Sequence, residues 1–148
     1  MRHQRHYTLE QANAVRGWVA QRVGWVREAH AALVRLGPAV RETAAALDGS
    51  AGGAYPGREL ARPLVELSRA LGELEAVDIV LRDFERGLVD FPALRDQTTR
   101  DPRVQGRLDA EDASSAAREI YLCWLVDDEE TIGFWHEPEA GFAGRRPL

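Results

Sequence analysis

The sequence predicts an α+β protein in which a long antiparallel helical hairpin packs on a small antiparallel β-sheet of three to four strands. Three observations favour this class. The first half of the chain carries apolar residues at helical spacing, a Gly-rich segment divides that half, and the second half contains short β-branched and aromatic runs. At 148 residues the chain has the size of one domain, with the helical hairpin at 8–75 and the sheet half at 76–148.

The first predicted helix begins at a capping box. The hydroxyl of Thr8 is placed to accept from the backbone N–H of Gln11, and the Gln11 side chain returns to the cap. Pro38 lies inside the pattern that follows and predicts a kink or a break, because proline lacks the N–H donor. Apolar residues recur at three- and four-residue spacing, as in a helix with one buried stripe: Ala12, Val15, Val19, Val26, Ala29, Leu33, Leu36, Val40 and Leu47.

A Gly-rich loop at 48–57 separates this helix from a second one. The second helix is expected to face the first with a regular stripe formed by Leu60, Leu64, Leu67, Leu71 and Leu74. Trp18 and Trp25 lie one heptad apart on the first helix, off its main stripe. Two tryptophans at this spacing are candidates either for packing within the chain or for a homodimer interface.

The sheet half is predicted from four segments. Residues 77–81 alternate and are rich in β-branched side chains, and residues 87–94 follow as a second strand in which Pro92 predicts an edge or bulged position. Residues 120–126 and 131–136 predict a β-hairpin with its turn at 127–130. A polar insertion at 97–117 separates these strands and is either disordered or a lid.

Composition excludes several classes of function. A formal charge of −5 and a pI near 5.4 argue against a general nucleic-acid binder. No apolar stretch reaches the roughly 18 residues that a membrane span needs, so we expect a cytoplasmic protein without a membrane partner. Cys123 is the only cysteine and lies in an apolar run, which predicts a buried thiol rather than a reactive one.

Four segments resemble the motifs of a family of small prokaryotic proteins known only as a domain of unknown function. Residues 7–13 (Y-T-L-E-Q-A-N) resemble its opening F-T-L-E-E-A-N, and residues 87–93 carry its central G-L-V-D-F-P-A. Residues 118–124 (R-E-I-Y-L-C-W) are similar to R-E-V-Y-L-C-W, and residues 134–148 to Y-W-H…G-F-A-G-R-Q-P-L. The resemblance implies membership of that family and brings no established activity. The chain departs from the pattern in its insertion after Asp96.

One candidate metal site lies at the end of the predicted hairpin. His136 ends the return strand, and carboxylates at Asp90, Glu130 and Glu139 are its candidate co-ligands. One imidazole and two or three carboxylates suffice for Zn, Fe or Mn. The alternative is that His136 is structural and hydrogen-bonds a carboxylate or a carbonyl.

The carboxy-terminal segment carries Arg145 and Arg146 beside glycines. An arginine fork matches a carboxylate or phosphate, so these residues are candidates for binding an anionic substrate. Alternatively, Arg145 pairs with Asp90 or Glu139 and fastens the tail to the domain.

Two functions follow from these patterns. The first is an interaction or structural module, expected to be a homodimer, whose helical hairpin presents a partner surface. The second is a metal-binding protein or metal-dependent enzyme centred on His136. The sequence contains no phosphate-binding glycine loop and no nucleophile motif, so it leaves open whether the protein is an enzyme.

Overall fold

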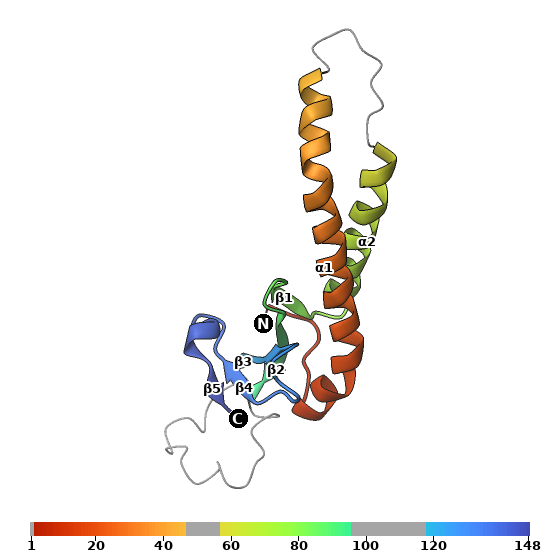
Figure 1. Ribbon diagram of the computed structural model, residues 1–148. Coiled ribbons are helices and arrows are strands. Elements are labelled where there is room, and N and C mark those ends of the chain that lie inside the picture. Colours follow the sequence, from red (N-terminus) through yellow and green to blue (C-terminus); the bar gives the residue numbers. More distant parts are fainter. Residues whose placement is uncertain (1, 47–56, 96–117) are drawn as a thin grey trace, which may run out of the picture.

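The computed structural model describes residues 2–46, 57–95 and 118–148, and it has the α+β architecture that the sequence predicts. Two helices form an antiparallel hairpin beside one antiparallel sheet (Figure 1). Neither helix combines the length and the apolarity that crossing a bilayer requires. The helices are α1 (Leu9–Ala46) and α2 (Gly57–Glu75), and the strands are β1 (Val80–Asp83), β2 (Leu88–Leu94), β3 (Glu119–Leu125), β4 (Phe134–His136) and β5 (Arg146–Pro147).

The sheet contains five strands in the order β1-β2-β3-β4-β5, so the predicted count of three to four is too low. The additional strand, β5, consists of two residues after a short 3₁₀ turn, η2 (Phe142–Gly144). Its polar, arginine-containing sequence carries no strand pattern, and only its pairing with β4 makes it a strand. The predicted insertion at 97–117 and the Gly-rich loop at 48–57 lie almost entirely outside the described residues.

The capping box at the start of α1 is confirmed. The backbone N–H of Gln11 donates to Thr8 Oγ1 over 3.2 Å, and the N–H of Thr8 donates to Gln11 Oε1 over 3.0 Å. Tyr7, the preceding residue, is buried, and its hydroxyl donates to the carbonyl of Val77. Its ring meets Phe91 edge to face, so the first turn of α1 is fixed against the sheet.

The predicted break at Pro38 is absent, because α1 runs through this residue to Ala46. A proline removes one hydrogen bond from the ladder, whereas the remaining turns of a 38-residue helix keep theirs. Pro63 is likewise inside α2, where it is buried. Leu47, the last residue of the predicted stripe, lies outside the described residues.

The core lies where the lower part of the helical hairpin meets one face of the sheet, while the distal parts of both helices extend away from it (Figure 1). Alternate residues of β2 and β3 supply this face. The buried core residues include Ala12, Val19 and Val23 from α1, Leu74 from α2, Val89, Phe91 and Ala93 from β2, Ile120, Leu122 and Trp124 from β3, and Trp135 from β4.

The predicted leucine stripe of α2 is wrong in part. Leu74 is buried and Leu67 is half-buried, but Leu64 and Leu71 remain 51% and 41% exposed. Small or compact side chains, Pro63 and Ala70, take the inward positions instead. Two of the five leucines therefore point to solvent.

Strand β2 lies inside the sheet, yet Pro92 still occupies a locally unpaired edge. Strand β1 pairs with β2 only between Leu88 and Asp90. Beyond that point, the carbonyl of Pro92 accepts the backbone N–H of Tyr7 over 2.7 Å. The amide nitrogen and the carbonyl of one strand residue point to the same side, so the missing N–H of proline faces no strand.

Two strand boundaries differ from the prediction. The first strand begins at Val80 instead of residue 77, because the preceding residues form a turn in which Asp78 has a positive φ of 59°. The return strand begins at Phe134 instead of residue 131. Ile132 therefore does not share a face with Phe134. It belongs to the core that faces the helices, and its N–H donates to the side chain of Asn13.

Arg27 of α1 holds the turns at one end of the sheet. Its guanidinium donates to the carbonyls of Phe84 and Glu85 and pairs with Asp127 over 2.7 Å. Gly87 permits this close approach, because a Cβ there would lie 2.7 Å from the guanidinium. Gly87 also has a φ of +68°, which other residues adopt at a cost.

Candidate functional site

The structure brings together two of the four predicted metal ligands, Asp90 and His136. Strand β3 lies between their strands, with Asp90 opposite Cys123 and His136 opposite Tyr121, on the face away from the helices. Nε2 of His136 lies 3.2 Å from each carboxylate oxygen of Asp90. Asp90 and His136 are only 1% and 2% exposed, so they form a buried ion pair.

Both nitrogens of the His136 ring are occupied within the protein. Nδ1 lies 2.9 Å from the carbonyl of Glu137, a pure acceptor, so this nitrogen carries a proton. Burial lowers the pKa of His136, but the hydrogen bonds with Asp90 and the Glu137 carbonyl outweigh it and raise the pKa above 6.5. Since a metal needs a free lone pair on an imidazole, this arrangement favours an imidazolium–carboxylate pair.

The other two predicted ligands lie elsewhere. Glu130 is exposed in the β3–β4 connection, and Glu139 pairs with Arg2 over 3.1 Å. Across residues 2–46, 57–95 and 118–148, no group of three or more His, Cys, Asp or Glu side chains is arranged to hold a metal ion. The contacts of His136 with Asp90 and with the carbonyl of Glu137 favour the alternative in which this histidine is structural.

Arg82 completes the environment of Asp90. Its Nε donates to Asp90 Oδ2 over 2.8 Å, and its guanidinium lies 5.0 Å from the centre of the Tyr121 ring. The Tyr121 hydroxyl reaches Nε2 of His3 over 2.8 Å. The buried pair is therefore one part of a polar network that joins four strands, β1 to β4, to the amino-terminal segment.

Sequence reasoning missed Arg82, Tyr121 and His3. The alternation within β3 offered a signal for Tyr121, because it shares a face with Cys123 two residues on. His3 offered none, since the amino-terminal segment has no periodic pattern and reaches the sheet only in the folded chain.

Cys123 is a buried core thiol, as predicted. It is opposite Asp90 in the β2–β3 pairing, and burial, followed by the negative charge of Asp90, raises its pKa to about 12. Its thiolate is therefore scarce at neutral pH, which disfavours a nucleophilic role.

The carboxy-terminal arginines pack on aromatic rings. Arg145 pairs with Glu129 over 3.2 Å, rather than with Asp90 or Glu139 as predicted. Its guanidinium also lies 4.4 Å from the ring centre of Phe134, while that of Arg146 lies 5.4 Å from the ring centre of Trp135. These contacts favour the alternative in which Arg145 fastens the carboxy-terminal tail to the domain.

Trp18 and Trp25, the predicted interface residues, are half-buried and lie beside the boundary between the two helices. The guanidinium of Arg22 stacks on both rings, at 4.0 Å from the centre of Trp18 and 4.8 Å from that of Trp25. Arg22 also pairs with Glu73 of α2 over 2.9 Å, and Arg69 of α2 lies over Trp25. The tryptophans thus help to join α1 to α2, and their part in a dimer stays a prediction.

These features define an α+β protein whose helical hairpin covers one face of a five-stranded antiparallel sheet, with a buried Asp–His pair on the other face. The chain belongs to the family described as uncharacterized conserved protein (DUF2203), whose model matches residues 5–99 and 112–148. The match omits residues 100–111, which lie within the predicted insertion at 97–117. No curated protein and no solved structure matches the chain. The resemblance is confirmed for a family of unknown function, while a prokaryotic origin and the individual motifs stay predictions.

Proposed function

We propose that the protein is an interaction module that forms a homodimer through the outer surface of α2. The observation that carries this proposal is the exposure of Leu64 and Leu71, one heptad apart on the same helix. Val65 is also exposed, and Ser68 lies between the two leucines. We call these four residues the α2 outer stripe.

The α2 outer stripe has the composition of a helix-packing surface. Single exposed apolar residues are ordinary on a soluble protein, but two leucines seven residues apart recur on one side of a helix. Burying both against a second helix removes apolar area from water that the single chain leaves exposed.

A second copy of the chain fits this surface because the stripe matches itself. If two α2 helices lie antiparallel about a two-fold axis, Leu64 of each copy faces Leu71 of the other, as an interface of this symmetry requires. The two ion pairs of α2, Arg62–Glu66 and Arg69–Glu73, lie on the opposite side of the helix and stay outside this interface.

Sedimentation equilibrium over a range of concentrations tests the proposal. We expect the wild-type chain to approach twice its monomer mass and the double variant Leu64→Gln, Leu71→Gln to remain monomeric with an unchanged circular dichroism spectrum. The matched control is Val34→Gln, which removes an exposed apolar side chain from α1 and leaves the dimer intact. A wild-type chain that stays monomeric, or a double variant that still dimerises, contradicts the proposal.

A further inference from the structure

Glu119 at the start of β3 is a buried carboxylate whose two oxygens have unequal surroundings. Its side chain is 8% exposed. Oε2 accepts the backbone N–H of Arg2 over 2.8 Å and that of His3 over 3.4 Å, and Nε2 of His6 lies 3.1 Å away. Oε1 is also buried but has no hydrogen-bond partner within the described part of the chain.

The Glu119 carboxyl is nevertheless held in its charged form. Burial raises its pKa, but the hydrogen bonds from His6, Arg2 and His3 together lower it below the ordinary value. A buried charged oxygen without a donor is unfavourable, and folded proteins satisfy nearly all such groups. Oε1 therefore marks a place for a donor from outside the described residues.

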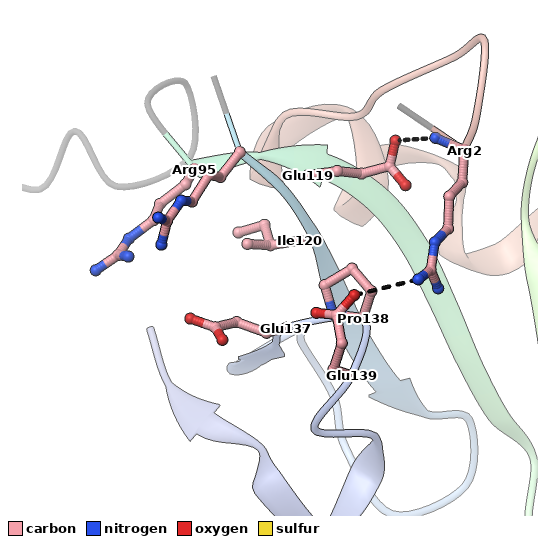
Figure 2. A pocket seen from close by; sticks show the side chains of 8 residues that line it. Arg2, Arg95, Glu119, Ile120, Glu137, Pro138 and Glu139 are labelled. Carbon is pink, nitrogen blue, oxygen red and sulfur yellow. Dashed lines mark hydrogen bonds and ion pairs between the residues drawn. The ribbon is translucent and has the colours of Figure 1, made fainter. Parts of the chain in front are cut away.

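Glu119 lines a cavity of about 310 Å³ between the start of β3 and the turn that follows β4. This volume is at the lower end of the range for small-molecule sites. Figure 2 shows Arg2 and Arg95 on opposite sides of Ile120. Among the described residues, the charged ones that line the cavity are three arginines and three glutamates: Arg2, Arg95, Arg118, Glu119, Glu137 and Glu139.

An equal number of cationic and anionic groups suits a ligand that carries both charges itself. Arg2 lies beside the Glu119 carboxylate, because its backbone N–H donates to Oε2. Its guanidinium crosses to Glu139, and both side chains of that pair are largely exposed (Figure 2). Exposed ion pairs are weak, so this guanidinium can exchange Glu139 for another carboxylate at little cost.

We propose that this cavity binds a free α-amino acid, with its ammonium group donating to Oε1 of Glu119 and its carboxylate paired with Arg2. An ammonium has three N–H donors and satisfies the one buried side-chain oxygen that is left without a partner in the described part of the chain. The carboxylate and the guanidinium form the charge-assisted pair that Arg is best suited to make. This site is independent of the α2 outer stripe, because it lies at the sheet.

The test is a thermal-shift screen of the whole chain with the common L-amino acids at millimolar concentration, followed by calorimetric titration of the one that stabilises most. We expect saturable binding of at least one amino acid. The N-trimethylated derivative of that amino acid keeps both charges but lacks N–H donors, and we expect it not to bind. A screen without any hit, which would leave only water on Oε1, overturns the proposal, and so does equal binding of the trimethylated derivative.

Two variants locate the site without disturbing the buried carboxylate. Arg2→Gln keeps the backbone N–H on Oε2 but removes the guanidinium, so binding weakens by at least about tenfold. Glu139→Gln releases Arg2 and leaves binding unchanged or tighter. Both side chains are largely exposed, so neither change prevents folding. Binding that is insensitive to Arg2→Gln places the amino acid elsewhere and contradicts the proposal.

Discussion

The sheet and the outer part of the helical hairpin use their side chains in opposite ways. In the middle of the sheet, the buried carboxylate of Asp90 is paired with both His136 and Arg82. On α2, Leu64 and Leu71 remain exposed although their spacing is that of a packed helix. The difference fits the proposal that a partner covers the outer side of α2, whereas the polar groups around Asp90 are satisfied within one chain. Substitutions on the sheet should therefore change folding, and those on α2 should change association.

The largest effect on folding is expected at the buried ion pair. Asp90→Ala leaves His136 and Arg82 without their carboxylate, and breaking a buried pair from one side costs about 3–5 kcal/mol in the free energy of unfolding. Urea unfolding followed by circular dichroism measures the loss. The control is Glu130→Ala, an exposed carboxylate from the same predicted site, which changes stability little. Equal losses in the two variants would show that burial of the pair is unimportant.

A smaller loss of folding stability is expected for a substitution in the turn that Arg27 contacts. Gly87→Ala places a Cβ 2.7 Å from the Arg27 guanidinium and 3.1 Å from Val126 Cβ, at a positive φ. The left-handed conformation alone costs a non-glycine residue about 1–2 kcal/mol, and the displaced guanidinium adds to this. Gly17→Ala is the matched control, because it lies in α1 with no atom near the new Cβ and should raise stability slightly. If thermal unfolding gives the same result for both, the proposed role of Gly87 is wrong.

The capping box tests the start of α1. Thr8→Ala removes the acceptor for the Gln11 N–H, and loss of such a cap costs about 1 kcal/mol. Chemical denaturation of Thr8→Ala beside the exposed control Thr131→Ala measures the difference. A loss no larger than that of the control would mean that Tyr7 alone fixes the start of the helix.

The folding stability that the Asp90–His136 pair contributes should depend on pH. The pKa of His136 is raised in the folded chain, so the stabilisation by its charged form is complete below about pH 6.5 and is lost as pH rises through the folded pKa. The stability of wild type relative to His136→Gln should therefore fall as pH rises above about 6.5, the ordinary pKa of histidine. Urea midpoints measured on both sides of that pH, with equal slopes required, test the sign. A difference that stays flat or increases with pH contradicts the assignment of an imidazolium.

Local chemistry made part of the fold predictable. Thr8 and Gln11 specify a helix start by themselves, and the continuous apolar run of residues 120–126 identified the central strand β3. The five leucines of α2 were predicted to face α1 together because they recur at helical spacing. That spacing does not specify which of two neighbouring stripes of the helix is buried. The structure turns Pro63 and Ala70 inward, beside a helix that carries Trp18 and Trp25.

The candidate site was predictable only in part. The motifs identified Asp90 and His136, but their contact depends on strand register, which no local pattern specifies. Glu130 and Glu139 were grouped with them by proximity in sequence, whereas one lies in the β3–β4 connection and the other reaches Arg2. The role of Glu119 was not predicted, because its partners lie in the amino-terminal segment. Arg2, one of these partners, is 117 residues away in the sequence.

The smallest effect on folding is expected on the α2 outer stripe. Leu64→Gln and Leu71→Gln alter exposed side chains, so at concentrations where the chain is monomeric the free energy of unfolding should change by no more than about 0.5 kcal/mol. Dilute-solution unfolding of each variant checks this. A large loss would show that these leucines pack within one chain, contrary to their exposure.

The most direct test of the central claim is a distance measurement between spin labels on Ser68→Cys, at the middle of the α2 outer stripe. Cys123 is buried and does not compete for the label. Packed helices lie about 8–10 Å apart, so the account predicts strong dipolar coupling between labels of two chains, which dilution with unlabelled protein removes. A label at Asp128→Cys, in the exposed β3–β4 connection, should show no coupling at that range. Absence of coupling at Ser68 under conditions where the chain is dimeric would contradict the proposed interface.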